Sequence, residues 1–252
     1  MLKDLPRVQA QLDGRVDLRE WFPPVDDPDG LRSCVAHACV GLVQYFERRS
    51  SGRVVRTLPR LLYQMSRRLL HWSGDCGTQC RPTLKALVRF GLPPEKYCDT
   101  ATEQFDTAPE AFLFCYAAPY QSIRYLRLDT SGADGAATLA RMRAHLAAGF
   151  PCLFGFPLCS ALSDAAEIPF PTAFDQACGG IAAVAVGYDD DRRIRSTRGA
   201  LLIRSSWGEG WGERGYGWLP YAYVEKRLAV DFWTLLKPEW LASQEFLDPM
   251  PE

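Results

Sequence analysis

The stretch Val25-Asp-Asp-Pro-Asp-Gly-Leu-Arg-Ser-Cys-Val-Ala-His-Ala-Cys39 runs from an acidic, Pro- and Gly-containing loop directly into a helix pattern. Ser33 is a preferred N-cap residue, and apolar side chains recur at helical spacing from Val35 to Phe46. This pattern predicts Cys34 in the first turn of a largely buried helix. Unpaired N–H groups and the dipole at a helix start favour a thiolate, as a nucleophilic cysteine requires. A small buried cysteine without chemistry also fits the pattern.

The composition is that of a globular chain without an obvious charged partner. With 252 residues and 47% hydrophobic side chains, it can bury a sizeable core as one domain or two lobes. A net charge of −1 gives no indication of nucleic acid or of an anionic membrane as a partner. The N-terminal residues contain no apolar signal core, and no run approaches the length of a membrane span. We expect a soluble, cytoplasmic protein.

The cysteines do not indicate a disulfide framework or a metal site. Their number is nine, and an odd count in a chain of this size argues against a closed set of disulfides. Cys76 and Cys80 have a spacing that could suggest zinc, but no second pair at ligand spacing accompanies them. We therefore expect neither a metal nor another cofactor.

The periodicity of the chain changes halfway along it. Helices are expected at residues 34–49, 58–70, 82–90 and 109–116 in the first half, and at 136–148 in the second. Strands are expected at 122–128, 152–156, 180–188, 200–204, 216–219 and 231–236, with an acidic turn at 189–191. A helical half followed by a mostly antiparallel β half predicts the α+β class.

Three segments, in this order, resemble a known family. They are Gly30-Leu-Arg-Ser-Cys-Val-Ala36, Gly179-Gly-Ile-Ala-Ala-Val-Ala-Val-Gly-Tyr-Asp-Asp190 and Ser205-Ser-Trp-Gly-Glu-Gly-Trp-Gly-Glu-Arg-Gly-Tyr216. The last is the most specific, because its Trp and Gly spacing extends over the whole segment. The chain resembles the papain-like (C1-type) cysteine peptidases, and among them the compact bacterial members that lack an inhibitory prosegment.

The resemblance covers about residues 15–236 and implies a single papain-like domain of two lobes. A helical lobe at about 25–118 and an antiparallel, barrel-like β lobe at 119–236 are expected to enclose a cleft. Residues 1–24 are expected to cross both lobes, and residues 237–252 to form a C-terminal tail.

The resemblance also implies where the catalytic groups of the family should stand. That chemistry needs a thiolate, an imidazole base, an orienting amide and an oxyanion donor. Cys34 falls on the nucleophile, but Ile181 follows the Gly-Gly pair where the histidine should be. Ser205 takes the place of the asparagine, and Pro28 that of the oxyanion glutamine. Trp207 is retained and is expected to pack over the site.

These replacements predict a protein that does not hydrolyse peptides. An imidazole partner lowers the pKa of a papain-type thiol to about 3–4, against about 8.5 for free cysteine. Losing a catalytic group costs related hydrolases about four to six orders of magnitude in turnover. Proline has no N–H that could replace the glutamine amide. We interpret the chain as a papain-like pseudoenzyme.

Other side chains are candidates to replace the missing groups. His71 lies just ahead of Asp75 on the loop that lines the substrate cleft in the family, so it is the first candidate base. His37 follows Cys34 by one helical turn and would approach from inside the helical lobe. Cys178 precedes Ile181 and is expected near the same site, where a redox role with Cys34 is open. An ordinary structural role fits each of them as well.

Three classes of function remain open from the sequence. The first is a non-proteolytic protein that binds a peptide, a carrier-bound group or a protein partner in the cleft between the lobes. The second is a thiol-dependent acyltransferase or condensing enzyme that uses Cys34 with a base from outside the family. The third is a weak, atypical cysteine peptidase.

The cleft residues predict the chemistry of a bound partner. Ile181 makes the expected site more apolar than that of a peptidase. Asp26, Asp27 and Asp29 give the loop before Cys34 an acidic rim. The expected ligand is a peptide segment with an apolar anchor and a basic flank, whose association depends on charge.

Overall fold

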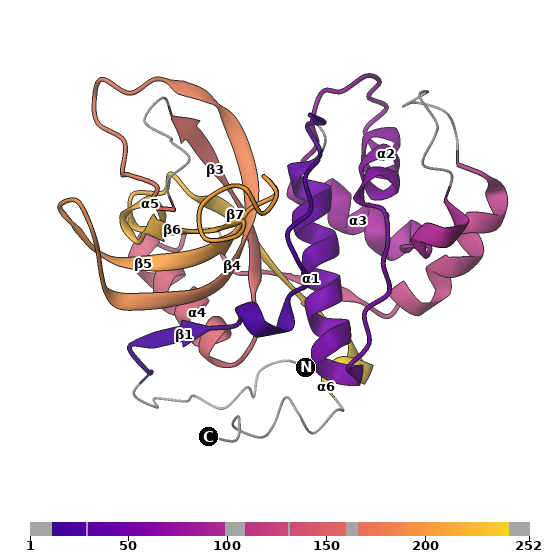
Figure 1. Ribbon diagram of the computed structural model, residues 1–252, viewed down its shortest axis with the longest axis horizontal. Helices are drawn as coiled ribbons and strands as arrows, with labels where there is room; N and C mark the ends of the chain where they lie inside the picture. The colour runs from indigo at the N-terminus through magenta and orange to yellow at the C-terminus, as the bar shows by residue number, and fades with distance from the viewer. Residues whose placement is uncertain (1–11, 29, 99–108, 131, 160–165, 242–252) are drawn as a thin grey trace.

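The computed structural model describes residues 12–28, 30–98, 109–130, 132–159 and 166–241. Within them the first half of the chain forms a helical lobe and the second half a β lobe, with α1 between the sheet and the other helices (Figure 1). The helical lobe contains α1 (Cys34–Ser51), α2 (Pro59–Leu69), α3 (Cys80–Phe90) and the 3-10 helices η2 (Glu95–Tyr97) and η3 (Ala111–Tyr120). The α+β class and the two-lobe arrangement predicted from the sequence are confirmed.

The helix that begins at Cys34 forms because almost every position of it is buried against another element. It has 18 residues and ends at Gly52, whose left-handed backbone (φ 66°) donates its N–H to the carbonyl of Arg48. Ser33 stands at the N-cap position, but its side chain does not cap the helix. Its hydroxyl lies 3.1 Å from Nδ1 of His37 instead.

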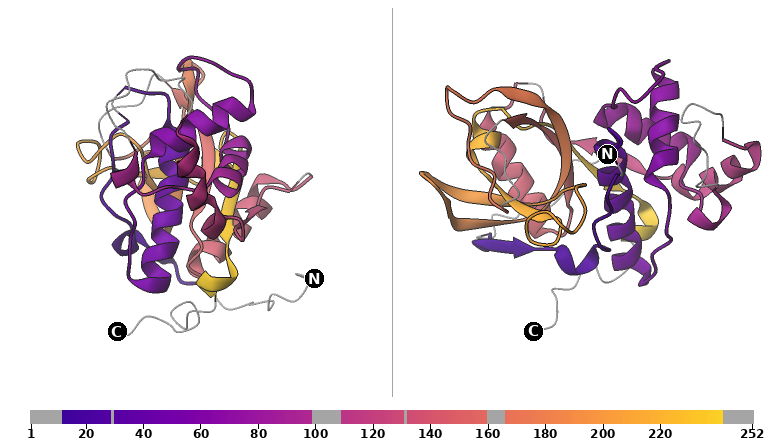
Figure 2. Two further views of the ribbon diagram at one scale, coloured as in Figure 1. Left: turned by 90° about the vertical axis from the view of Figure 1, so that its right-hand side faces the viewer. Right: turned by 45° about the horizontal axis from the view of Figure 1, so that its top comes forward.

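The β lobe is built on one seven-stranded antiparallel sheet. The strand order is β2-β7-β3-β4-β5-β6, and β1 pairs with β4. The strands are β1 (Arg15–Asp17), β2 (Arg124–Arg127), β3 (Cys152–Cys159), β4 (Ala177–Ile194), β5 (Thr197–Arg204), β6 (Tyr216–Pro220) and β7 (Val230–Leu236). Two helices accompany them, α4 (Gly135–Ala147) and α5 (Ala222–Glu225). The sheet is strongly curved, as expected of a barrel-like lobe (Figure 2).

The long strand β4 extends beyond the predicted one. The acidic residues 189–191 were expected to end it, and that prediction is wrong. The register shifts after Asp189, and pairing with β5 resumes at Arg193 and Ile194. The carboxylate of Asp189 accepts the backbone N–H groups of Asp191 and Arg192 at 2.9 and 3.0 Å. The bulge therefore satisfies its own donors, and the strand continues.

The N-terminal segment links the two lobes. Its strand β1 pairs with β4, and the 3-10 helix η1 (Arg19–Trp21) follows. Phe22 then packs on Tyr45 of α1, with ring centroids 4.7 Å apart. The described part of this segment, from residue 12 onward, thus runs from the sheet to α1 (Figure 1).

The segment after β7 also packs on α1. Residues 237–252 were predicted to form a tail, but Pro238–Leu241 form the short helix α6. There Trp240 is buried and stacks on Phe46 at 4.8 Å. The apolar Trp240 explains this docking, and the residues from 242 onward lie outside the described part of the chain.

Candidate active site

The thiol of Cys34 lies where the start of α1 meets β4. Burial raises its pKa above the ordinary value, while hydrogen bonds from the backbone of Ala182, Val35 and Cys34 itself act in the opposite direction. The net pKa is raised, so the N–H groups at the helix start do not compensate for desolvation. Ile181 precedes Ala182 on β4, so its backbone adjoins the residue that contacts the thiol.

Ile181 contributes only apolar surface to this site. Its side chain is 6% exposed and belongs to the hydrophobic core. It pairs with Phe156 of β3 across the ladder. At this position the side chain neither accepts nor donates a proton.

Ser205 lies at the end of β5, and its hydroxyl is engaged within its own segment. It donates to the carbonyl of Gly215 at 2.9 Å and accepts the N–H of Trp207 at 3.3 Å. The ring of Trp207 packs edge-on against Trp211, with centroids 4.7 Å apart. The hydroxyl thus stabilises the segment in which Ser205 takes the place of the family's orienting asparagine.

The acidic loop before α1 turns at Pro28. The carbonyl of Pro28 accepts the N–H of Leu31 at 3.0 Å, and the proline has no N–H of its own. Asp26 and Asp27 are exposed. Asp27 lies against Gly208, where a Cβ would be 3.2 Å from its Oδ2. Asp29, the third residue of the predicted acidic rim, is outside the described residues.

Asp75 holds the loop that leads into Cys34. Its carboxylate accepts the N–H of Arg32 at 3.0 and 3.2 Å and the hydroxyl of Tyr63 at 2.7 Å. The Tyr63 oxygen in turn accepts the N–H of Gly77 at 2.8 Å. Asp75 is therefore an anchor of the nucleophile loop. The sequence did not indicate Tyr63, because on the apolar face of α2 it looks like any other core residue.

Neither candidate base, His71 or His37, is hydrogen-bonded to the thiol of Cys34 among the described residues. His71 is exposed in the turn after α2, and no hydrogen bond or ion pair among the described residues joins it to Cys34. The Nδ1 atom of His37 lies 3.1 Å from both the carbonyl and the hydroxyl of Ser33. Burial lowers the pKa of His37. Its ring thus faces the start of its own helix.

Cys178 is exposed at the start of β4, three residues before Ile181. Its thiol lies 3.5 Å from the carbonyl of Gln176. The cysteine opposite it in the sheet is Cys159 of β3.

A buried arginine, which the sequence did not indicate, binds the backbone just before the acidic loop. Arg204 is 4% exposed and donates to the carbonyls of Pro23 and Pro24 at 3.2 and 2.6 Å. Burial lowers its pKa, which Tyr216 and Asp26 counteract. The sequence feature that could have indicated this buried arginine is Gly41, a glycine within the apolar face of α1. A Cβ there would lie 3.5 Å from the guanidinium carbon.

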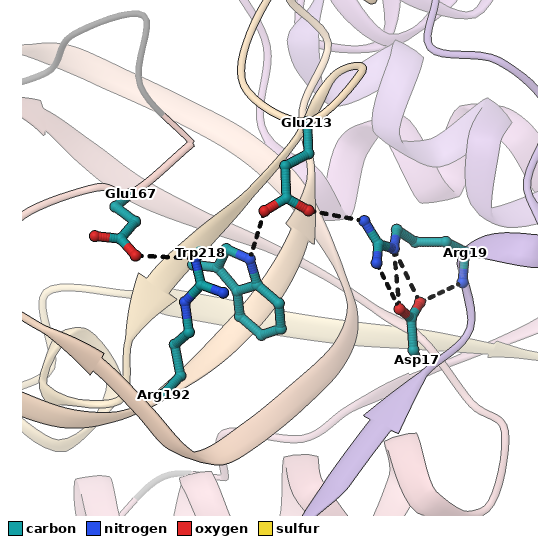
Figure 3. A network of polar contacts seen from close by, with 6 residues as sticks. All are labelled: Asp17, Arg19, Glu167, Arg192, Glu213 and Trp218. Carbon is teal, nitrogen blue, oxygen red and sulfur yellow. Dashed lines mark hydrogen bonds and ion pairs between the residues drawn. The ribbon is translucent and has the colours of Figure 1, made fainter.

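A polar network links the N-terminal segment, through Asp17 and Arg19, to the Trp- and Gly-rich segment at residues 205–216 (Figure 3). Arg19 pairs with Asp17 at 2.7 Å and with Glu213 at 3.0 Å. Glu213 also accepts the indole N–H of Trp218 at 3.2 Å. The guanidinium of Arg192 lies over the Trp218 ring, 4.6 Å from its centroid. These groups are partly exposed, so each ion pair contributes little alone, but the network joins Glu213 to both Arg19 and Trp218.

The described residues give no sign of a metal site or a membrane span. No group of three or more His, Cys, Asp or Glu side chains among them is placed to hold a metal ion. Across the same residues, no helix combines the length and apolar character that spanning a bilayer requires. A hollow of about 620 Å³ in the β lobe lies away from Cys34, between the start of α4 and the start of β7.

Comparison with known proteins defines the class. No family model matches the chain. The crystal structure of xylellain, a cysteine protease from Xylella fastidiosa, is 30% identical and superposes with a TM-score of 0.76, covering 90% of this chain and 87% of that one. The peptidase C1-like protein L477 of Acanthamoeba polyphaga mimivirus, itself uncharacterized, is 27% identical over 95% of this chain and 77% of that protein.

A more distant structure shares the fold. Digestive procathepsin L 3 of the Tenebrio molitor larval midgut is 16% identical, with a TM-score of 0.60 over 91% of this chain and 71% of that one. The chain belongs to the papain-like C1 cysteine peptidase family. The family predicted from the three sequence segments is thereby confirmed.

Proposed function

We propose that this chain is a non-proteolytic member of the papain-like family that binds a peptide or protein segment between its lobes. The observation that carries the proposal is the surroundings of the Cys34 thiol. The backbone of Ala182 contacts the thiol, the residue before Ala182 is the buried, apolar Ile181, and burial raises the pKa of the thiol. A nucleophilic cysteine needs the opposite, a charged partner and a lowered pKa.

The other replaced positions support the same proposal. The Ser205 hydroxyl is bound to the Gly215 carbonyl, so it does not orient a base. Pro28 offers no side-chain amide to an oxyanion, and removing one such donor alone costs about two to three orders of magnitude in turnover. Losses within one catalytic unit are not additive, but one of them is enough to suppress hydrolysis.

The edge of β4 supports a peptide as the ligand. Residues Ala177–Gly180 are exposed and pair with β3 on one side. In the described part of the sheet, pairing with β5 begins only at Val184. The other edge of this stretch can therefore accept an extended chain by main-chain hydrogen bonds. Apolar Ile181 and the exposed carboxylates of Asp26 and Asp27 favour a segment with an apolar anchor and a basic flank.

A second candidate is a thiol-dependent acyltransferase or condensing enzyme. The favouring observation is that backbone groups of Cys34, Val35 and Ala182 surround the sulfur. N–H groups in this arrangement would also stabilise the oxyanion of an acyl group carried by Cys34. Such a reaction would need a base supplied by the substrate.

One experiment separates these activities. The purified chain is incubated with a mixture of unstructured peptides and, in parallel, with a simple acyl thioester, and both reactions are followed by mass spectrometry. The proposal predicts intact peptides and unmodified Cys34. Hydrolysis that disappears in Cys34→Ala would establish a peptidase instead. An acyl adduct on Cys34 would establish the second candidate.

The peptide site has its own test. A library of peptides with apolar and basic residues is screened for binding to wild type and to Cys34→Ala, which should bind equally. For a peptide found in this way, Asp26→Lys should slow association and flatten its salt dependence. Ile181→Asp should weaken binding by about tenfold or more. If both variants bind like wild type, the ligand lies elsewhere on the molecule.

A further inference from the structure

Two cysteines face each other across a bulge where β3 ends and β4 begins, near the top of the β lobe in Figure 1. The ladder pairs Leu158 with Gly179 and then Cys159 with Ala177, so Cys178 is the additional residue on β4. In a β-bulge, two residues of one strand oppose a single residue of the other. Ala177 and Cys178 therefore both oppose Cys159.

Both thiols are free and within reach of solvent-borne reagents. Cys178 is exposed and Cys159 is half-buried. The thiol of Cys178 is held at 3.5 Å from the carbonyl of Gln176. Burial raises the pKa of Cys159, and the nearby charges of Asp175 and Cys178 raise it further. The electrostatic effect of one thiol on the other agrees with the register of the ladder.

The local backbone allows the two thiols to approach. Opposed residues of antiparallel strands have Cβ atoms about 4.5–5.5 Å apart, and a disulfide needs about 3.5–4.5 Å. Cys159 is paired with Ala177, so closing the link to Cys178 also requires a shift of the bulge. Gly179 follows Cys178 directly and has a φ of +143°, which a side chain would disfavour. A flexible glycine beside a bulge can absorb such a shift.

We propose that Cys159 and Cys178 form a redox-active pair that closes to a disulfide when the chain meets a low-molecular-weight disulfide such as oxidised glutathione. The exposed Cys178 loses its proton and attacks the glutathione disulfide, which releases one glutathione thiolate. Cys159 then loses its proton and attacks the mixed disulfide at the Cys178 sulfur, which releases the second. Two protein thiols are oxidised, one glutathione disulfide is reduced to two glutathione molecules, and the two protons are taken up by these.

The pair lies on the strand that leads to the candidate active site. Gly180 and Ile181 follow the bulge directly, and Ala182 contacts the thiol of Cys34. A disulfide at Cys178 would fix the start of β4 and so hold the rim of the cleft. This inference does not depend on what the cleft binds.

The test maps the disulfide in the full chain. Wild-type protein is equilibrated with glutathione buffers of increasing oxidised fraction, quenched in acid and alkylated. Digestion without reduction, by trypsin and a protease that cuts after glutamate, separates the two cysteines at Glu167, and fragmentation of the linked peptides distinguishes Cys159 from Cys152. The expected product is a disulfide-linked pair of peptides carrying Cys159 and Cys178, formed with the joint loss of two alkylatable thiols.

Variants in which one cysteine is replaced by serine test the order of the steps. Cys159→Ser should accumulate glutathione on Cys178, at least tenfold more than wild type does, because no second thiol resolves the mixed disulfide. Cys76→Ser removes another exposed thiol and should leave the link unchanged, which makes it the matched control. Failure of wild type to form the link at any glutathione ratio would overturn the proposal. So would a link from Cys178 to a different cysteine, or equal glutathione on Cys178 in wild type and Cys159→Ser.

Discussion

At the scale of single residues, the thiol of Cys34 is subject to two opposing influences. Its position at the start of α1 provides backbone N–H groups, and burial between the lobes removes water from it. Desolvation has the larger effect on the pKa. In a working papain-type site an imidazolium would reverse this balance, and here Ile181 occupies the neighbouring position.

The pH dependence of alkylation at Cys34 follows from this balance. Because the pKa is raised and only the thiolate reacts, the rate should rise about tenfold per pH unit through pH 8 and beyond. Mass spectrometry of the Cys34 peptide after timed iodoacetamide treatment measures it, with the same peptide from unfolded protein as reference. The folded protein should react more slowly at pH 7. A rate that is already constant near pH 5 would show that an unrecognised base activates the thiol.

Restoring the two polar groups should lower the pKa of Cys34. In Ile181→His with Ser205→Asn, an imidazole beside the thiol stabilises the thiolate, so alkylation at pH 6 should increase at least tenfold. Ile181→Leu with Ser205→Asn is the matched control and should react like wild type. Hydrolysis should remain slow because Pro28 still supplies no oxyanion donor. Equal alkylation rates in both variants would contradict the placement of residue 181 beside Cys34.

At the scale of elements, the loop before α1 is positioned by contacts with the chain after α2. The carboxylate of Asp75 binds both the backbone N–H of Arg32 and the hydroxyl of Tyr63. The same hydroxyl accepts the N–H of Gly77. A carboxylate that accepts a backbone N–H and a hydroxyl at once gives the loop a defined shape without regular structure. This arrangement fixes the approach to Cys34.

Removing this anchor should destabilise the fold. Asp75→Ala leaves the buried Tyr63 hydroxyl and the Arg32 N–H without their acceptor, at a cost of about 1–3 kcal/mol in the free energy of unfolding. Tyr63→Phe removes the same hydrogen bond from the other side. Because the two residues interact, the double variant should lose less than the sum of the single losses, as measured by urea denaturation. Strict additivity would show that the two side chains do not act together.

At the scale of the whole molecule, α1 packs against elements of both lobes. The crossing segment, β4 and α6 all contact it. Near its C-terminal end, Glu47 is largely buried, and burial raises its pKa to about 7, although Lys237, Tyr120 and the backbone of Val55 favour the charged form. The folded state therefore holds the Glu47 proton more tightly than the unfolded chain, whose carboxyl has a pKa near 4.5.

The contribution of Glu47 to stability should therefore fall as the pH rises from about 4.5 to about 7. In that window the native state binds more protons than the unfolded state, so the free energy of unfolding decreases with pH. Glu47→Gln removes the titratable group. At pH 8 its free energy of unfolding should be about 1–3 kcal/mol higher than that of wild type, with little difference at pH 5. Urea unfolding of both proteins at the two pH values measures this. A difference of the same size at both pH values would contradict the raised pKa.

The sequence by itself predicted the elements whose pattern is local. The apolar spacing after Cys34 defines α1, and the apolar run at residues 180–188 defines the core of β4, because one buried face imposes a period on the residues that line it. The order of the three family segments predicted that these two elements belong to one papain-like site. The place of Ile181 beside Cys34 was expected on the same grounds.

Only the tertiary structure decided which distant residues meet. A bulge sets Cys178 against Cys159 of β3, a pairing that the sequence pattern did not predict. Asp75 was expected as a supporting residue of the cleft, and the structure shows that its carboxylate binds the backbone of Arg32. Hydrogen bonds and bulges of this kind depend on the register of strands and on the paths of loops. No periodicity along the chain encodes them, because each depends on a partner far away in the sequence.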